Sequence, residues 1–374
     1  MKIVIIPDSF KGTLSSVEIC GVVSKAVKSV RSDCEVVEIP IADGGEGSVD
    51  AFLYSAGSSG YKAEKIFIDA HDLYLNKVSA GIGIIGDTAV IEVAAVIGLD
   101  EKRKDVMHAS SLGVGELIDY ALDLKVKEMI LCLGGSGSND CGIGMAYALG
   151  ARFYGDKGEI TSLNGESLGD IREIHLDNLD KRIKNCRFRT ACDVTNPLYG
   201  KNGAAYVFAP QKGADENMVR TLDCNLKKFA DCVKRCSGAD ISKISGGGAA
   251  GGLGAASVFF LGASLESGIN LLLDKIDYEQ KVKDADLIIT GEGCIDSQSL
   301  SGKVISGILS RSQGKKIIAL CGKRGNGWKD FKDRGIDVVC INPTDQPLNI
   351  SMQKETARLN LYKTVESLDL IKMF

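Results

Sequence analysis

The sequence contains few of the residues that mark specialised classes of protein. Its 374 residues include one tryptophan, three histidines and six prolines, and its 45 basic side chains nearly balance 49 acidic ones. The net charge of −4 provides no field that would attract nucleic acid or an anionic membrane. The histidines have neither a zinc-binding nor a hydrolase-triad spacing. Small molecules are therefore the expected partners.

Cysteine spacing and apolar runs exclude two further classes. The 12 cysteines are too sparse for a disulfide scaffold and no two have the Cys-x-x-Cys spacing, so reduced thiols in a cytoplasmic protein are expected. The first apolar run, residues 3–6, is too short for a secretory signal. The uncharged stretch 244–265 is too rich in glycine for a membrane span. It predicts a loop followed by a short buried helix.

Short apolar runs recur at both ends of the chain. They are separated by helical stretches such as residues 15–30 and bounded by Gly, Pro or Asp, which is typical of strands buried on both faces of a parallel sheet. Five strands are expected, over residues 3–6, 36–41, 287–290, 317–321 and 338–341. The sequence thus predicts an α/β protein with a doubly wound parallel sheet built from both chain ends.

The middle of the chain has a different pattern. Residues 65–69, 77–80 and 89–93 are strand-like and joined by tight turns, which favours antiparallel pairing. Further strands are expected at 129–133 and 188–192, and helices at 112–124 and 218–236. We therefore expect a discontinuous domain of residues 1–64 and 276–374, and an inserted mixed α/β domain of residues 65–275.

Glycine-rich loops follow several predicted strands. The segment 134–140, Gly-Gly-Ser-Gly-Ser-Asn-Asp, lies between a strand and a helix. Glycine lets such a loop aim several N–H groups at one anion, although it also closes ordinary strand-to-helix turns. The G-x-G-x-x-G spacing at 81–86 lies within a hairpin, and no P-loop pattern is present. A nucleotide or phosphate must therefore be held by another device.

Carboxylates and lysines follow the same strand ends. Side chains at the carboxyl ends of parallel strands project into one crevice, where carboxylates suit Mg²⁺ or proton transfer; each taken singly can equally be a turn or helix-cap residue. The acidic residues in question are Asp8, Asp43, Glu46, Asp193, Glu292 and Asp296. Lys11 adjoins this crevice, whereas Lys212, in Pro-Gln-Lys-Gly, is expected to be a solvated surface lysine.

The order of these motifs resembles that of the bacterial class I glycerate kinases. The motifs that carry the resemblance lie at 7–12, 42–47, 134–140, 192–198, 248–254 and 290–296. The family implies phosphoryl transfer from ATP, with Mg²⁺, to a hydroxyl of D-glycerate, generally giving 2-phosphoglycerate. It also implies a flavodoxin-like domain joined to a second domain likened to restriction-endonuclease folds.

The motifs and the resemblance together predict how residues share the reaction. The expected catalytic residues are Asp8, Lys11, Asp193 and Asp296, with Asp8 or Asp193 as the base. The expected contacts of ATP are Gly134, Gly135, Ser136, Ser138, Asn139, Gly248, Gly251 and Lys303. Ser9, Lys11, Asp43 and Glu46 are expected at the glycerate, and Asp43, Asp193, Glu292 and Asp296 at the metal. A cleft between the domains is expected to close over both substrates.

Two positions depart from the family pattern. Cys294 stands where an arginine is common, and Cys141 replaces a glycine, so Lys303 or Lys323 would have to supply a missing cation. Three alternatives stay open: a kinase of another small hydroxy acid, transfer to the 3-hydroxyl, and a nucleotide-binding sensor without turnover. Whether the chain forms a homo-oligomer also stays open.

Overall fold

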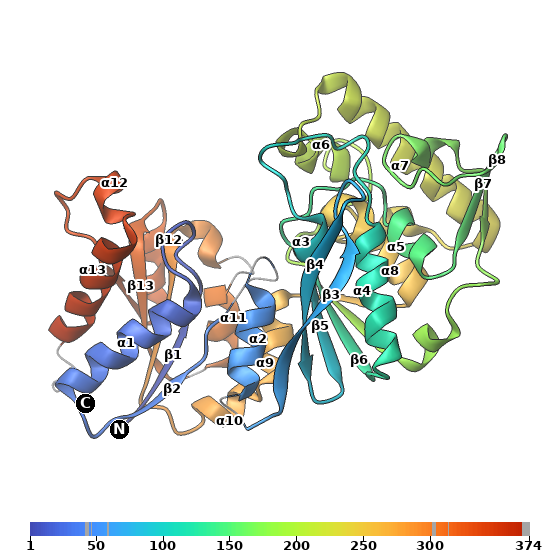
Figure 1. The fold of residues 1–374 in the computed structure, drawn as a ribbon. Helices are drawn as coiled ribbons and strands as arrows, with labels where there is room; N and C mark the ends of the chain where they lie inside the picture. Colours follow the sequence, from blue (N-terminus) through green and yellow to red (C-terminus); the bar gives the residue numbers. More distant parts are fainter. Residues whose placement is uncertain (42–44, 46, 58–59, 301–303, 313, 369–374) are drawn as a thin grey trace. The chain divides into compact units, whose positions relative to one another are not determined.

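The chain folds into two compact units. The computed structural model describes residues 1–41, 45, 47–57, 60–300, 304–312 and 314–368 (Figure 1). Unit 1 consists of Met1–Asp43, Asp50–Lys62 and Ile269–Phe374, and unit 2 of Gly44–Val49 and Ala63–Gly268. Among the residues just given, no helix is long and apolar enough to cross a membrane.

Unit 1 is built on a five-stranded parallel sheet. Side by side, its strands are β14 (Ile336–Cys340), β13 (Lys316–Arg324), β12 (Leu287–Ile295), β1 (Lys2–Pro7) and β2 (Glu35–Glu38). Counted along the chain from the β2 edge, this order is 2-1-3-4-5, a doubly wound order in which ligands bind beyond the carboxyl ends of the strands. The five apolar runs predicted these strands correctly because parallel strands are covered on both faces.

Helices from opposite ends of the chain pack together in unit 1. The helices are α1 (Ser16–Val30), α2 (Ser48–Gly57), α9 (Gly268–Lys275), α10 (Tyr278–Val282), α11 (Val304–Arg311), α12 (Leu348–Ser351) and α13 (Lys354–Ser367), with short 3₁₀ turns η6 (Ser297–Leu300) and η7 (Trp328–Arg334). Helix α1 begins at a capping box, in which Ser15 Oγ accepts from the Glu18 amide and the Glu18 carboxylate accepts from the Ser15 amide. Helix α13 lies beside α1 (Figure 1).

Glu18 joins these two helices electrostatically. Its carboxylate lies 2.7 Å from Lys354 Nζ and 2.5 Å from Arg358 Nη2, both on α13. Burial opposes ionisation of Glu18, but the hydrogen bonds from Lys354, the Ser15 amide and Arg358 prevail and lower its pKa to about 2. The first helix of the chain is thereby fastened to the last described one.

Unit 2 contains a six-stranded mixed sheet. Its strands lie in the order β11 (Ser264–Glu266), β10 (Arg187–Ala191), β6 (Glu128–Cys132), β5 (Thr88–Glu92), β4 (Lys77–Ile85) and β3 (Ala63–His71). The expected antiparallel pairing is confirmed for β3, β4 and β5. Strands β5, β6, β10 and β11 pair in parallel instead, which places their carboxyl ends at one edge.

Helices and a second, small sheet complete unit 2. The small sheet has the order β8 (Gly158–Glu159), β7 (Arg152–Gly155) and β9 (Glu173–His175). The helices are α3 (Ala94–Ile97), α4 (Leu112–Asp123), α5 (Ile143–Ala148), α6 (Ala204–Phe208), α7 (Glu216–Ser237) and α8 (Leu253–Leu261), with 3₁₀ turns η1 (Ser167–Asp170), η2 (Lys181–Asn185), η3 (Pro210–Lys212), η4 (Ile241–Lys243) and η5 (Ala249–Gly252). Helix α8 is the short buried helix expected within 244–265.

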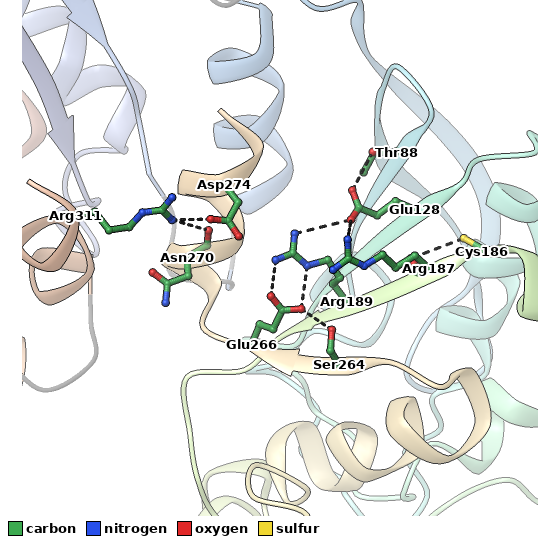
Figure 2. Close-up of polar contacts among 10 residues, drawn as sticks. All are labelled: Thr88, Glu128, Cys186, Arg187, Arg189, Ser264, Glu266, Asn270, Asp274 and Arg311. Atoms are coloured by element: carbon green, nitrogen blue, oxygen red, sulfur yellow. Dashed lines mark hydrogen bonds and ion pairs between the residues drawn. The ribbon is translucent and has the colours of Figure 1, made fainter. Parts of the chain in front are cut away.

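Charged side chains connect four strands of the unit 2 sheet. Arg189 of β10 donates from Nε to Glu266 of β11 at 2.9 Å, and its guanidinium lies 3.9 Å from Glu128 of β6 (Figure 2). Thr88 of β5 donates to the same Glu128 at 3.3 Å. Only 10% of the Arg189 side chain is exposed, and its hydrogen bonds lower the pKa of Glu266. Arg189 therefore ties together the parallel strands on which the loops described below are carried.

Replacing Arg189 with methionine should destabilise unit 2, because Glu266 would lose the cation it bonds and Glu128 would lose one of its two arginine neighbours. Breaking a buried ion pair costs about 3 to 5 kcal/mol, and the partial exposure of Glu266 reduces this to roughly 2 to 4 kcal/mol. Since the pKa of Glu266 is depressed, this contribution is present above pH 4.5, the ordinary glutamate value, and is lost as the pH falls below it. Thermal unfolding of R189M and wild type at pH 7 and pH 4 measures both effects.

Arg220→Met is the matched control, because Arg220 pairs with Glu216 on the surface of α7 with both side chains largely exposed. Such a pair contributes less than about 1 kcal/mol. Equal unfolding midpoints for R189M and R220M at pH 7 would contradict the structural role of Arg189.

Candidate functional site

In unit 1, acidic residues lie where β1 ends and its pairing with β12 stops. The last register pair of these strands is Pro7 with Gly291, and Asp8 and Glu292 come next along each strand. Asp8 is 6% exposed and Glu292 8% exposed. The Asp8 amide donates to the Gly291 carbonyl at 2.8 Å, while the Asp8 carboxylate accepts from the Ser9 amide at 2.7 Å. The structure therefore brings Asp8, Ser9 and Glu292 together, as parallel strand ends require.

The remaining predicted residues of unit 1 extend along the same edge. Asp296 directly follows β12 and is half-buried, and its amide donates to Ser299 Oγ at 3.2 Å. Lys11 is exposed, on a segment whose backbone lies against Gly293. Cys294 is the register partner of Lys323 on β13, so one of the two lysines expected to replace the family's arginine adjoins it. Asp43, Glu46 and Lys303 lie outside the described residues.

In unit 2, the loops after β6 and β10 begin side by side. The last register pair of these strands is Cys132 with Ala191, so the segments 133–140 and 192–198 leave the sheet at one edge. Asp193 is exposed there, and its Oδ1 accepts from the Gly268 amide at 3.1 Å, just beyond the end of β11. Two separate motifs of the sequence thus meet in unit 2.

The loop 134–140 carries buried polar groups that the rest of the described chain does not satisfy. Ser136 is 7% exposed, and Ser138 and Asn139 are fully buried. Ser138 Oγ and both side-chain polar atoms of Asn139 have no hydrogen-bond partner among the described residues. Leaving a buried polar group unpaired costs about 1 to 3 kcal/mol, so such groups in a native protein call for a partner such as a ligand or an ordered water. Gly134 and Gly135, which precede them, are half-buried and exposed, so the loop reaches the surface.

Asp140, which the sequence analysis did not single out, secures this loop. Its buried carboxylate accepts from the Ser111 amide at 2.8 Å, from Ser111 Oγ at 2.6 Å and from the Gly142 amide at 3.2 Å. Burial raises its pKa even though these hydrogen bonds favour the charged form. Ser111 precedes α4 and Gly142 precedes α5, so one carboxylate joins the beginnings of two helices to the loop. The only signal in the sequence was the position of Asp140 at the end of the glycine loop.

The second glycine segment, 246–252, packs its backbone against the first. Gly251 has φ +66°, and a Cβ on it would stand 2.1 Å from the Ser138 carbonyl oxygen. Its own carbonyl accepts from the Cys141 amide at 3.0 Å. Cys141 has φ +50°, a region that favours glycine. Glycine at 251 is needed for close approach of the backbone.

Gly248 connects the same segment to the loop after β10. Its amide donates to the Asn196 carbonyl at 3.0 Å, so that N–H is used within the fold. A Cβ on Gly248 would stand 2.3 Å from the Pro197 carbonyl oxygen. Three motifs that lie far apart in the sequence therefore form one cluster of backbone contacts in unit 2.

Lys212 also belongs to this cluster, and the expectation that it is a solvated surface lysine is wrong. The residue is 3% exposed. Its Nζ donates to the Ser138 carbonyl at 2.7 Å and to Ser136 Oγ at 3.3 Å. The turn Pro210–Lys212 aims it inward, and the proline and glycine that frame this turn were the signal available in the sequence. Burial lowers its pKa to about 7.

Metal-ligating side chains do not form a ready-made cage in the described part of the chain. No group of three or more His, Cys, Asp or Glu side chains there is arranged to hold a metal ion. Mg²⁺ commonly keeps several waters and is held by one or two carboxylates together with substrate phosphates. The described carboxylates at the strand ends could supply one or two ligands of this kind, but they do not form a metal site without substrate phosphates.

Comparison with known proteins identifies relatives over nearly the whole chain. The profile of the glycerate kinase family matches residues 3–371. The glycerate 2-kinase of Escherichia coli (strain K12) is 42% identical over 346 residues, which cover 91% of this chain and 90% of that protein. The glycerate kinase of Bacillus cereus is 39% identical, covering 98% and 97% respectively.

A solved structure has the same fold. A crystal structure assigned as glycerate kinase 2 from Salmonella typhimurium LT2 matches with a TM-score of 0.85 and 36% sequence identity, covering 98% of this chain and 97% of that chain. The mixed α/β architecture predicted from the sequence is thereby confirmed.

Gly251→Ala should disturb the loop 134–140, because the new methyl group would collide with the Ser138 carbonyl. Gly238→Ala is the matched control, since Gly238 also has positive φ, +78°, but nothing lies within 4 Å of its Cβ position. The unfavourable φ alone costs about 1 to 2 kcal/mol in each variant. We expect G251A to lose more stability than G238A in thermal unfolding and to lose turnover as well. Equal losses would show that the contact with Ser138 is unimportant.

Proposed function

The chain belongs to the glycerate kinase family, and we propose that it transfers the γ-phosphoryl group of ATP to the 2-hydroxyl of D-glycerate, giving 2-phosphoglycerate and ADP. The acceptor is inferred from the relatives, of which the E. coli protein is named glycerate 2-kinase. The observation that carries the proposal in this chain is the loop 134–140, whose buried Ser138 hydroxyl and Asn139 amide have no partner among the described residues. Such groups suit the oxygens of a polyphosphate.

We assign the nucleotide phosphates to the loops of unit 2. Ser136, Ser138 and Asn139 would bind phosphate oxygens, and Gly134 and Gly135 would let the backbone approach them. Gly248 and Gly251 act by holding the second glycine segment against the loop, since they allow the contacts with Asn196 and Ser138. We propose Lys303 as a further contact of the phosphates from the sequence alone, because it lies outside the described residues.

We assign the hydroxy acid to the strand ends of unit 1. Ser9 and Lys11 would bind the glycerate carboxylate, with Asp43 and Glu46 at its hydroxyls. The base that accepts the hydroxyl proton would be Asp8 or Asp193. The position of Asp8 supports the first choice, because it lies beside Ser9, which is assigned to the glycerate, and a base must lie within hydrogen-bond reach of the hydroxyl.

The described carboxylates near the strand ends do not form a complete metal site by themselves, because no three of them are arranged to hold an ion. We propose that Mg²⁺ enters with ATP and is held by phosphate oxygens and one or two of Asp43, Asp193, Glu292 and Asp296. When bound, the metal supplies charge that stabilises the transferring phosphoryl group. The work of the chain itself is then positioning of both substrates and exclusion of competing water.

We further propose that the two units are the domains of the protein. Unit 1 would be a flavodoxin-like domain, because its strand order is the order of that fold. Unit 2 would be the inserted mixed domain. In this proposal residues 44–49 belong to the inserted domain, just as they belong to unit 2. The sequence analysis expected a different division, into residues 1–64 with 276–374 and residues 65–275.

A phosphorus NMR spectrum of the product tests the reaction and its site together. Incubation with ATP, Mg²⁺ and D-glycerate should release ADP and give a phosphate ester split into a doublet by the single proton on C2. A triplet would indicate transfer to the 3-hydroxyl, and faster turnover of another acid in a panel of small hydroxy acids would indicate a different substrate. If ATP stabilises the protein but no acid in the panel leads to release of ADP, the protein is a nucleotide-binding sensor and the proposed kinase activity is rejected.

Asp296→Asn should leave the fold intact and reduce turnover at least a hundredfold, because it removes a charge assigned to the metal and phosphates. Loss of one preorganised electrostatic group typically lowers the rate about 10²- to 10³-fold. Asp333→Asn, at an exposed position of unit 1, is the control and should behave as wild type. Steady-state kinetics and thermal unfolding of both variants make the comparison. Near wild-type turnover of D296N would remove Asp296 from the active site.

A further inference from the structure

The buried ammonium of Lys212 makes its hydrogen bonds with neutral oxygen atoms. Its Nζ donates to the Ser138 carbonyl at 2.7 Å and to Ser136 Oγ at 3.3 Å, and the charge that acts on it is the Asp140 carboxylate, which forms no ion pair with it. An ammonium has three donors, so one remains for another acceptor. Burying a cation without a paired anion is costly, and an apolar side chain at this position would avoid that cost. A bound anion would offset the cost.

Local structure leaves Lys212 little freedom to turn away from this position. The turn that carries it ends at Gly213, which has φ +97°. A Cβ on Gly213 would stand 2.4 Å from the Lys104 carbonyl oxygen, so the chain passes too close for any other residue. The carbonyl that receives Lys212 is the same Ser138 oxygen that Gly251 approaches. Cation and loop are thus held in a fixed relation by backbone contacts on both sides.

We propose that Lys212 is the cation of an oxyanion-binding site in unit 2, and that it binds a phosphate or carboxylate group of a substrate together with Ser136, Ser138 and Asn139. The unpartnered Ser138 hydroxyl and Asn139 amide supply the neutral donors that such an anion requires. The assignment of this anion to a kinase substrate rests on the proposed function, whereas the binding site itself rests on the geometry of unit 2.

The burial of Lys212 adds a pH dependence to this site. Burial lowers its pKa to about 7, and the negative charge of Asp140 opposes this effect. Lys104 also lies near the turn, with its backbone beside Gly213 and its ammonium paired with Glu101 at 2.7 Å. Asp215 follows the turn, and its carboxylate accepts from the Asn217 and Met218 amides at the start of α7. A bound anion favours the charged lysine, so at pH 8 binding should be accompanied by uptake of on the order of one proton.

Protonation also links Lys212 to folding. The unfolded chain holds this lysine at its ordinary pKa of 10.5, so between pH 7 and 10.5 the unfolded state binds more protons than the folded one. The stability contributed at this position is therefore lowest at and below pH 7 and rises as the pH increases through that window. A methionine in place of Lys212 should remove this rise.

Titration calorimetry on the whole chain at pH 8, in two buffers of different ionisation enthalpy, tests the proposal with ATP plus Mg²⁺ and with D-glycerate as separate ligands. We expect one ligand to bind wild type with proton uptake, and Lys212→Met to abolish that uptake and weaken the same ligand about tenfold to a hundredfold. The affected ligand identifies the anion as phosphate or carboxylate. Lys228→Met, at an exposed position on α7, should bind as wild type.

Absence of proton uptake by wild type with both ligands would overturn the proposal, as would unchanged affinities in K212M. If K212M does not fold, Lys212→Arg replaces it, and a permanently charged residue should bind the anion without proton uptake. A merely structural lysine predicts lower stability of K212M without a selective loss of one ligand. Proton-linked binding without phosphorylation of glycerate would reject the proposed function and leave this site standing.

Discussion

The desolvation of one loop is the constraint on which the rest of unit 2 depends. Residues 136–140 bury hydroxyl, amide, carboxylate and, through Lys212, ammonium groups at the end of β6. Burial of so many polar groups is tolerated only if each finds a partner. Asp140 finds its partners in the backbone at the beginnings of α4 and α5, which also fixes the path of the loop. Ser138 Oγ and the Asn139 amide, which have no partner in the described part of the chain, are the groups that we propose for a ligand.

Close backbone packing maintains that arrangement. Gly251 approaches the Ser138 carbonyl and Gly248 approaches the Pro197 carbonyl, at distances that no side chain allows. The parallel register of β6 and β10 brings the loops that follow them to one edge of the sheet. Arg189 on β10 joins these strands to β11 through its contacts with Glu128 and Glu266. Stability in this unit is therefore coupled to the geometry of the loop, because the same contacts serve both.

In unit 1 the positions of the acidic residues depend mainly on the pairing of parallel strands. These residues lie on or just after strands that are covered on both faces, and the register of β1 with β12 places them. Asp8 and Glu292 are adjacent because each is the next residue after the last register pair, Pro7 with Gly291. The electrostatic anchor of this unit lies elsewhere, at Glu18, where α1 and α13 meet.

Much of the fold and part of the site could be predicted from the sequence, because both depend on local patterns. Apolar runs determine buried parallel strands, and the tight turns predicted β3, β4 and β5. The sequence likewise determined that Asp8, Ser9 and Glu292 would share a sheet edge, since side chains near the carboxyl ends of neighbouring parallel strands lie at the same edge of the sheet. Family motifs along the chain pointed to the glycerate kinases for the same reason: each is a short contiguous segment.

Only the tertiary structure decided the environment of Lys212, Asp140 and Gly251. The proline and glycine around Lys212 mark a turn but do not show that the lysine is buried, because its buried contacts are with Ser136 and Ser138, more than seventy positions away in the chain. One partner of Asp140, Ser111, is 29 positions away, and the need for glycine at 251 arises from a carbonyl of another loop. Charge, pKa and close approach are properties of what surrounds a residue, and for these residues the surroundings are assembled only when distant segments of the chain meet.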